Sequence, residues 1–435
     1  MDKETLSNYG WIVICVLVLA VMLALASPFG SFVAVGVKST TAGLFETNQK
    51  ALNTTGLMSI DDQNFDDGTI PLGGTYTTSE GTVLSGNSND SFPETPATGD
   101  TYEYGDYIYK YNCYYWPSDW VKNTFQNGWG VRVKDTSKSS YGEILSEIVG
   151  KPVTNMRSTF DSCTSLTTAP AIPDSVTSMT YTFAGCTKLT KAPTIPNGVT
   201  NMSYTFNRCT SLTTAPEIPN RVTSINGTFW NCTSLKVAPV IPNSVTKISY
   251  TFKDCTSLTT APSIPNSITS IQSAFEGCTS LTTAPTIPNR VTDMQGTFAY
   301  CTSLTTAPTI PSKVTNMYCT FKGCTSLSTA PAIPSCVTNM YCTFDGCINL
   351  TTAPTIPSSV TQMGGTFRGC TSLTDTITIN TNKLTNYDCT NCFSLGSIGK
   401  DITLAGTSTK LQMLANTSTA GKRTVYDING NILKQ

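Results

Sequence analysis

Residues 291–313 read VTDMQGTFAYCTSLTTAPTIPSK, and the same 23-residue pattern recurs along most of the chain. Ten cysteines fall one period apart without a slip: Cys163, Cys186, Cys209, Cys232, Cys255, Cys278, Cys301, Cys324, Cys347 and Cys370. A phenylalanine stands three positions before each of them and a leucine three positions after it. A fixed period of this length with recurring apolar positions indicates a solenoid.

The recurring apolar positions are predicted to form one continuous core. A single coil cannot bury its own Val, Met, Phe, Cys, Leu and Ile side chains, whereas stacked coils pack each against its counterpart in the next coil. The Leu-Thr-Thr-Ala segment is the expected strand, and it ends at the following proline because proline offers no N–H to a ladder. The sequence therefore predicts a β-rich solenoid of ten coils over residues 151–393.

The unit resembles the BspA-type leucine-rich repeats of bacterial and protozoan surface proteins, whose pattern is C-x-x-L-x-x-I-x-I-P-x-x-V-x-x-I-x-x-x-A-F-x-x-C. Here the stretch Val291 to Phe298 is one residue shorter than in that pattern, and Leu304 to Pro311 is one longer. We therefore expect a leucine-rich-repeat-like solenoid whose curvature and strand length differ from the usual form. The resemblance implies a cell-surface adhesion or binding protein whose partner is a host or neighbouring-cell protein or glycan, and it brings no catalytic residues.

The composition gives no support to an enzyme or to a nucleic-acid-binding protein. The chain has 27 basic and 28 acidic residues and no histidine. A net charge of −1 gives no electrostatic reason to expect nucleic acid. Without histidine, the commonest general base and transition-metal ligand are absent. We expect no catalytic residue, no cofactor and no metal site.

The cysteines are predicted to serve packing. There are 17 of them, and the ten that share one repeat position cannot converge on a metal ion. Cysteine is small, apolar and often buried, so these ten are expected to be reduced core thiols. Cys319 and Cys342 share another repeat position on neighbouring coils, each within Tyr-Cys-Thr-Phe. Since adjacent coils bring such residues within disulfide range, this pair is the candidate disulfide.

The N-terminal segment is predicted to place the chain at the cell surface or outside the cell. Residues 11–26 are all apolar, and no charge occurs from residue 10 to residue 37. Three interpretations stay open: a membrane anchor, a secretory signal that is cleaved after Ala26, and a helix that assembles into a filament. The third rests on a loose resemblance to type IV pilin-like proteins, with residues 1–10 as leader and 11–55 as the helix and its polar extension. Cys15 stands where those proteins usually carry a glutamate.

The segments that flank the repeats are predicted to be a linker and two caps. Residues 56–100 are rich in Gly, Ser, Thr, Asn and Asp and carry no Lys or Arg, which indicates an acidic flexible linker. Residues 101–150 hold tyrosines spaced mostly by two, a strand period, and are the expected aromatic N-terminal cap. A carbohydrate-binding unit is the alternative, since sugars stack on aromatic rings. The repeat decays after Asp375, and residues 394–435, with a hairpin turn after Tyr426, are the expected C-terminal cap.

Positions that vary between coils are predicted to be exposed and to carry any ligand contact. They are the residue between Pro and Ile and the pair between Phe and Cys. Large aromatic residues at two of these positions suit an anchoring role, although they could also pack only on neighbouring coils. The candidate ligand-face residues are Trp230, Tyr300, Arg208, Glu217 and Lys253.

Overall fold

The computed structural model describes residues 74–434, with gaps at 86–92, 94, 117–118, 123–126, 374–375, 386–387, 389, 394–400 and 418–423. The predictions for residues 1–55, including the leader and the apolar helix, lie outside the described residues. Across the described ranges, no helix has the length and hydropathy of a membrane span.

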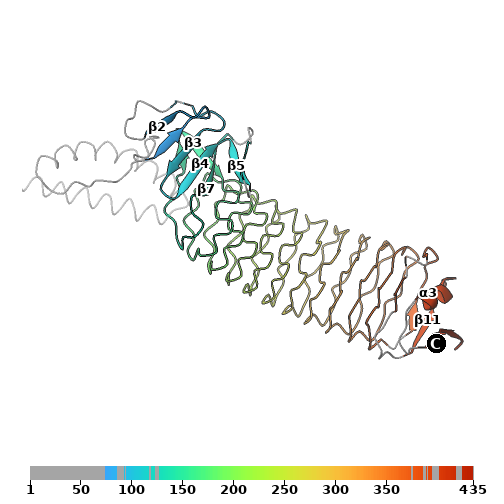
Figure 1. The fold of residues 1–435 in the computed structure, drawn as a ribbon. Coiled ribbons are helices and arrows are strands. Elements are labelled where there is room, and N and C mark those ends of the chain that lie inside the picture. The colour runs from blue at the N-terminus through green and yellow to red at the C-terminus, as the bar shows by residue number, and fades with distance from the viewer. Residues whose placement is uncertain are drawn as a thin grey trace, which may run out of the picture. The chain divides into compact units, whose positions relative to one another are not determined.

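The N-terminal part folds as a seven-stranded sheet in the order β2-β1-β3-β4-β7-β9-β8 (Figure 1). Its strands are β1 (Thr75–Thr77), β2 (Val83–Ser85), β3 (Thr101–Tyr104), β4 (Tyr107–Tyr111), β7 (Trp129–Val133), β8 (Glu147–Ile148) and β9 (Lys151–Asn155). Neighbouring strands are antiparallel, except that β7 and β9 are parallel. A separate hairpin pairs β5 (Cys113–Trp116) with β6 (Asp119–Lys122).

The prediction of a flexible linker over residues 56–100 is wrong for the part of that segment that the structure describes. Strand β1 pairs with both β2 and β3, and Tyr76 is fully buried. The Tyr76 hydroxyl donates a hydrogen bond to the Asp100 carboxylate, which also accepts the backbone N–H groups of Ser79 and Ala97 at 2.7 and 2.8 Å. The polar, acidic composition did not reveal this fold, because the segment is held by a few specific contacts of Tyr76 and Asp100 and by strand pairing.

Aromatic side chains of the sheet and of the segment before β8 contact the first coil of the repeats. Tyr107 and Tyr141 pack against Phe160, with ring centroids 6.2 and 5.2 Å away. The Thr159 hydroxyl donates to the Val131 carbonyl at 2.8 Å, so β7 stands in for a preceding coil. The sheet rings that are at most 1% exposed are Tyr76, Tyr102, Tyr107, Tyr109 and Trp129. Because those rings are buried, they act as a cap and leave no open face for a sugar.

The coils of the repeat stack pair through single-residue parallel bridges rather than through strands (Figure 1). One row of bridges includes Ser178, Asn201 and Ser224, and a second includes Thr214, Val237 and Thr260. The second row lies in the Leu-Thr-Thr-Ala segment, where a strand was predicted. The position of the pairing was therefore predicted correctly, but only one residue per coil pairs instead of a whole strand. A proline two residues after each of these bridges prevents the ladder from lengthening.

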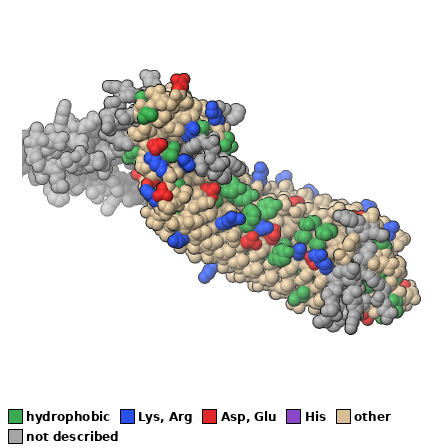
Figure 2. All heavy atoms as spheres, viewed as in Figure 1, with side chains coloured by type: hydrophobic (Ala, Val, Ile, Leu, Met, Phe, Trp, Pro, Cys, Tyr) green, Lys and Arg blue, Asp and Glu red, His purple; other side chains and the backbone are tan. Residues whose placement is uncertain are grey.

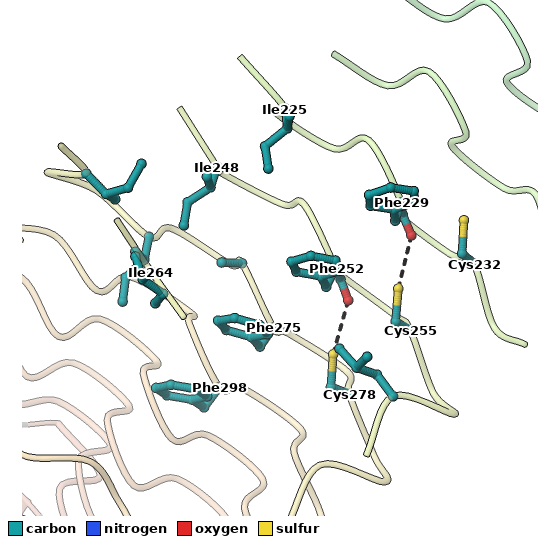
Figure 3. Packing of buried hydrophobic residues seen from close by; sticks show 14 of the residues in the cluster. Ile225, Phe229, Cys232, Ile248, Phe252, Cys255, Ile264, Phe275, Cys278 and Phe298 are labelled. Atoms are coloured by element: carbon teal, nitrogen blue, oxygen red, sulfur yellow. Dashed lines mark hydrogen bonds between the residues drawn. The ribbon is translucent and has the colours of Figure 1, made fainter. Parts of the chain in front are cut away.

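The predicted core is confirmed. The recurring Val, Met or Ile, Phe, Cys and Leu side chains are at most 1% exposed, and the recurring Ile is at most 9% exposed apart from Ile333, which is partly buried. Figure 3 shows the phenylalanines of successive coils lying one above another. Neighbouring rings are 5.1–5.9 Å apart between centroids and within 2–11° of parallel. Like-on-like stacking therefore joins every coil to the next along one continuous column.

The cysteines of the repeat form a second buried column, the thiol row. Each Sγ from Cys186 to Cys370 donates to the carbonyl of the preceding coil's phenylalanine, at 3.0–3.2 Å (Figure 3). All ten are free thiols. Burial raises the pKa of Cys163 to about 11 and that of Cys347 to about 12. These thiols therefore stay protonated at neutral pH and serve packing.

The threonine that precedes each repeat phenylalanine forms a third buried column, which the sequence pattern did not reveal. From Thr182 to Thr366 its hydroxyl donates to a Met or Ile carbonyl of the preceding coil at 2.7–3.1 Å. A buried hydroxyl needs such a partner to offset its lost hydration. One coil departs from the column, because Ala274 occupies the threonine position and is fully buried.

Replacement of Ala274 by threonine is expected to stabilise the repeat stack. The new hydroxyl would reach the Ile248 carbonyl as its counterparts do, and one such bond contributes about 0.5–1.5 kcal/mol. Urea unfolding followed by circular dichroism measures the change. Ala274→Val is the matched control, since it adds similar volume without a donor. Equal effects of the two substitutions would show that the hydroxyl contributes nothing.

The repeats end in a four-stranded sheet in the order β10-β11-β12-β13. Its strands are β10 (Thr376–Thr378), β11 (Ile402–Ala405), β12 (Val425–Asp427) and β13 (Ile432–Lys434), beside helix α3 (Leu411–Thr417). β12 and β13 form the hairpin predicted after Tyr426. The sheet continues the stack, because Ile379 bridges to Ile356 and Phe393 stacks on Phe367.

Candidate functional site

Two positions in each coil have positive φ and shape one exposed face of the repeat stack. They lie two residues before and two residues after the repeat phenylalanine, as at Tyr204 (φ 57°) and Arg208 (φ 61°). The coil turns sharply at both positions, and the side chains there lean over the next coil. Gly227 has φ 59°, and a Cβ at that residue would lie 2.3 Å from the Tyr204 ring. Glycine at 227 is therefore what lets the ring of Tyr204 lie flat on its neighbour.

Aromatic residues gather on this face and form what we call the aromatic band. Figure 2 shows hydrophobic, basic and acidic side chains clustered along the repeat stack, between wide areas of other residues. The members of the aromatic band are Tyr181, Tyr204, Trp230, Tyr250, Tyr300, Tyr318 and Tyr341. All are half-buried or exposed, so they are held in place by the stack while one edge stays accessible.

The first half of the aromatic band is a continuous run of contacts. Tyr181 and Tyr204 are stacked with centroids 4.7 Å apart, and Tyr204, Trp230 and Tyr250 follow at 6.4 and 6.0 Å. The ammonium group of Lys253 lies 5.4 Å above the Trp230 ring. Burial raises the pKa of Tyr181 and of Tyr204, so both phenols are neutral at physiological pH.

The charged side chains beside these rings are paired. Lys253 Nζ lies 2.8 Å from Glu276 Oε1, and Trp230 Nε1 donates to Asp254 Oδ2 at 3.2 Å. At the first coil, the Arg157 guanidinium lies 5.0 Å from the centroid of the Tyr114 ring and 6.0 Å from that of Tyr181. In the first half of the band, stacking therefore holds the aromatic rings in place, and ion pairs and hydrogen bonds hold the charged side chains beside them.

The second half of the aromatic band surrounds a buried carboxylate. Tyr318 and Tyr341 stack at 5.4 Å with 38% and 41% exposure. Asp345, 7% exposed, accepts two hydrogen bonds from Arg368 and lies 3.6 Å from Lys322 Nζ. The Asp345 carboxylate raises the pKa of Arg368, so the guanidinium stays charged. Lys322 also lies 5.7 Å from the centre of the Tyr300 ring.

The predicted ligand-face residues are only partly brought together. Trp230 and Lys253 are in contact, Tyr300 is 46% exposed further along the band, and Arg208 occupies an exposed left-handed position. Glu217 is exposed on a different row, between Pro216 and Ile218.

The exposure predicted for the residue between Pro and Ile is found in five successive coils, at Ala171, Thr194, Glu217, Val240 and Ser263. It fails in part for the pair between Phe and Cys, because Ala299 is only 3% exposed. A small side chain at that position is covered by the neighbouring coils.

Most of the aromatic band escaped the sequence interpretation. The signal was present, since Tyr181, Tyr204 and Tyr250 stand two positions before the repeat phenylalanine, and Tyr318 and Tyr341 three positions before it. These positions vary between coils as much as those that were considered. Within the described ranges, no cluster of three or more cysteine or acidic side chains is placed to hold a metal ion.

The comparison that decides the family concerns the repeats. The BspA type leucine rich repeat region, in six copies, matches residues 154–282, 226–319 and 295–417, which together span more than half of the chain. The chain belongs to the BspA type leucine rich repeat family. The expected leucine-rich-repeat solenoid is thus confirmed, and proteins of this family are generally found at the cell surface. Comparison with curated proteins finds no match.

Three solved structures are similar to this BspA-type chain. A Treponema leucine rich repeat protein (T. pallidum) is 29% identical over 42% of this chain and 85% of its own, with a TM-score of 0.37. A leucine-rich repeat protein from Bacteroides ovatus is 20% identical over 70% and 97%, with a TM-score of 0.40. A leucine rich cell surface protein from Faecalibacterium prausnitzii is 21% identical over 64% and 94%, with a TM-score of 0.35.

Proposed function

We propose that this chain is a cell-surface binding protein, and that the aromatic band is the surface on which it holds a protein ligand. The observation that carries the proposal is the seven half-buried or exposed aromatic side chains of the band, which include a group of four in contact and a stacked pair. Tyr, Trp and Arg are the residues most enriched in protein interfaces, because they give large contact areas with few rotamers to immobilise. A rigid solenoid that displays such a row is suited to adhesion.

The orientation of the rings favours a protein over a glycan. A sugar packs its C–H groups on an open aromatic face. Here Tyr181 and Tyr204 stack with centroids 4.7 Å apart, so each ring covers one face of the other. The opposite face of Tyr204 lies on Gly227. Tyr341 lies between Tyr318 and Gly364, where a Cβ would come within 2.9 Å of the ring. Ring edges and hydroxyl groups remain for a ligand, and these suit backbone and side-chain groups of a protein.

A protein and glycan array probed with the full chain tests this proposal. We expect binding to protein features and none to glycans. Binding only to glycans would overturn the choice of ligand class. Binding to no feature at all would count against the function as a whole.

We further propose that the uncharged segment of residues 10–37 holds the chain at the cell surface. Its apolar run is close to the length that a membrane helix needs. A retained anchor, a cleaved signal and a filament-forming helix differ in the mature N-terminus. Mass spectrometry of surface-extracted protein distinguishes an intact N-terminus from one that starts at Trp11 or Ser27.

A further inference from the structure

Cys319 and Cys342 lie in the second half of the aromatic band and differ from the thiol row in backbone conformation and in repeat position. Both have left-handed backbone conformations, with φ of 54° and 53°. Each stands two positions before a repeat phenylalanine, on successive coils. Cys319 is half-buried and Cys342 is 4% exposed, whereas the cysteines of the thiol row are fully buried.

The two cysteines occupy equivalent positions on adjacent coils that are hydrogen-bonded to each other. The neighbouring rings Phe321 and Phe344 are 5.7 Å apart, and the backbone N–H of Cys319 donates to the Tyr341 carbonyl at 2.9 Å. Equivalent residues on these coils are therefore about one coil spacing apart, which is compatible with the range of about 4.4–6.8 Å that a disulfide requires between Cα atoms. The two thiols also interact with each other, because each shifts the pKa of the other.

We propose that Cys319 and Cys342 form a disulfide that links two coils beneath the aromatic pair Tyr318 and Tyr341. The oxidant is an external disulfide. A thiolate of the pair attacks one sulfur of the external disulfide, expels a thiolate and leaves a mixed disulfide. The second cysteine attacks that mixed disulfide, forms the Cys319–Cys342 bond and expels the second thiol. The pair loses two electrons and two protons, and the external disulfide gains both.

Two features favour disulfide formation at Cys319 and Cys342 rather than among the cysteines of the thiol row. The interaction with the Cys319 thiol lowers the pKa of Cys342 while that of Cys319 rises, so the pair gives up its first proton more readily. In the thiol row, by contrast, burial raises the pKa of a cysteine such as Cys232, and each Sγ from Cys186 to Cys370 donates to a carbonyl. No external disulfide reaches a fully buried sulfur.

The consequence concerns ligand binding. Tyr318 and Tyr341 directly precede the two cysteines, so a covalent link between the coils fixes the stacking of these two rings. The bond closes a loop around one coil, which removes conformations from the unfolded chain and resists local opening of the stack. It thereby holds the second half of the aromatic band rigid outside the cell, where disulfides persist.

Peptide mapping of the full chain tests the proposal. Trypsin cleaves after Lys313, Lys322 and Arg368, which places Cys319 and Cys342 in adjacent peptides. After treatment with oxidised glutathione and alkylation, we expect peptides 314–322 and 323–368 to be joined, with a loss of two hydrogens that a reductant reverses. The link should vanish in Cys342→Ser and persist in Cys336→Ser, which removes an exposed cysteine of the same peptide. Full alkylation of Cys319 after oxidation, or a link that survives Cys342→Ser, would overturn the proposal.

Thermal unfolding provides a second measurement that does not depend on the digest. The oxidised chain should unfold roughly 5 °C or more above the reduced chain. The double variant with serine at both positions, Cys319→Ser and Cys342→Ser, should show no response to the oxidant. An equal response in that variant would assign the stabilisation to other cysteines and contradict the proposal.

Discussion

Between pH 9 and pH 10 the repeat stack is expected to lose on the order of 10 kcal/mol of unfolding free energy. Ten buried thiols form the thiol row, and burial raises the pKa values of the nine from Cys163 to Cys347. In the unfolded chain a cysteine ionises near pH 9, whereas in the folded stack the thiol stays protonated. The contribution of the protonated thiols to the free energy of unfolding is thus fully present below the pKa of cysteine in the unfolded chain. It is lost as the pH rises above that pKa, by about 1.4 kcal/mol per thiol and pH unit.

Urea or thermal unfolding in the presence of a reductant, across pH 7.5 to 10.5, measures this loss. A variant with Cys232→Ala, Cys255→Ala and Cys278→Ala is the control. It should be less stable at neutral pH, because three core side chains are truncated, yet its stability should fall less steeply with pH. The same steepness in both proteins would show that the thiol row does not cause alkaline unfolding.

Phe252→Ala is expected to destabilise the stack by about 3–5 kcal/mol. Phe252 is 1% exposed and stacks on Phe229 and Phe275 at 5.7 and 5.6 Å, so its loss opens a cavity and interrupts the column on both sides. In a solenoid each coil is stabilised by its neighbours. A substitution in a central coil therefore destabilises the coils on both sides of it.

The matched control for this prediction is Phe393→Ala at the end of the column, where the ring stacks on Phe367. Denaturant unfolding should show a smaller loss there, and hydrogen exchange should show it confined to the last coils. A loss at Phe393 as large as that at Phe252 would contradict the nearest-neighbour account of the stack.

The sequence was sufficient for the architecture of the repeats because the physics of stacking is periodic. A side chain that recurs every 23 residues meets its own copy, so the burial of Phe, Cys and Leu followed from the period alone. The buried threonine column was missed because threonine is also an ordinary surface and strand residue. Its hydroxyl becomes a core group only when a carbonyl of the preceding coil lies within reach.

The candidate site was harder to predict because it depends on turns. Left-handed φ at Tyr204 or Tyr300 directs the ring across the next coil, and neither a residue type nor a spacing reveals that conformation in advance. The pairing of Asp345 with Arg368 likewise joins residues that are one period apart, which becomes visible only when coils are aligned in space. The segment of β1 was misjudged for a related reason, since its order comes from Asp100 and Trp129 rather than from its own composition.

The central claim is that the aromatic band binds a protein ligand. The most direct test compares the affinities of two double variants for the protein that the array shows to be bound most strongly. Tyr318→Ser with Tyr341→Ser removes two exposed rings of the aromatic band. Val237→Ser with Val240→Ser removes two side chains that are 62% and 84% exposed on a different row. We predict that the tyrosine variant weakens binding at least tenfold while the valine variant binds as the parent chain does, since a tenfold loss corresponds to about 1.4 kcal/mol. Unchanged affinity in the tyrosine variant, or an equal loss in both, would contradict the assignment of the aromatic band as the binding surface.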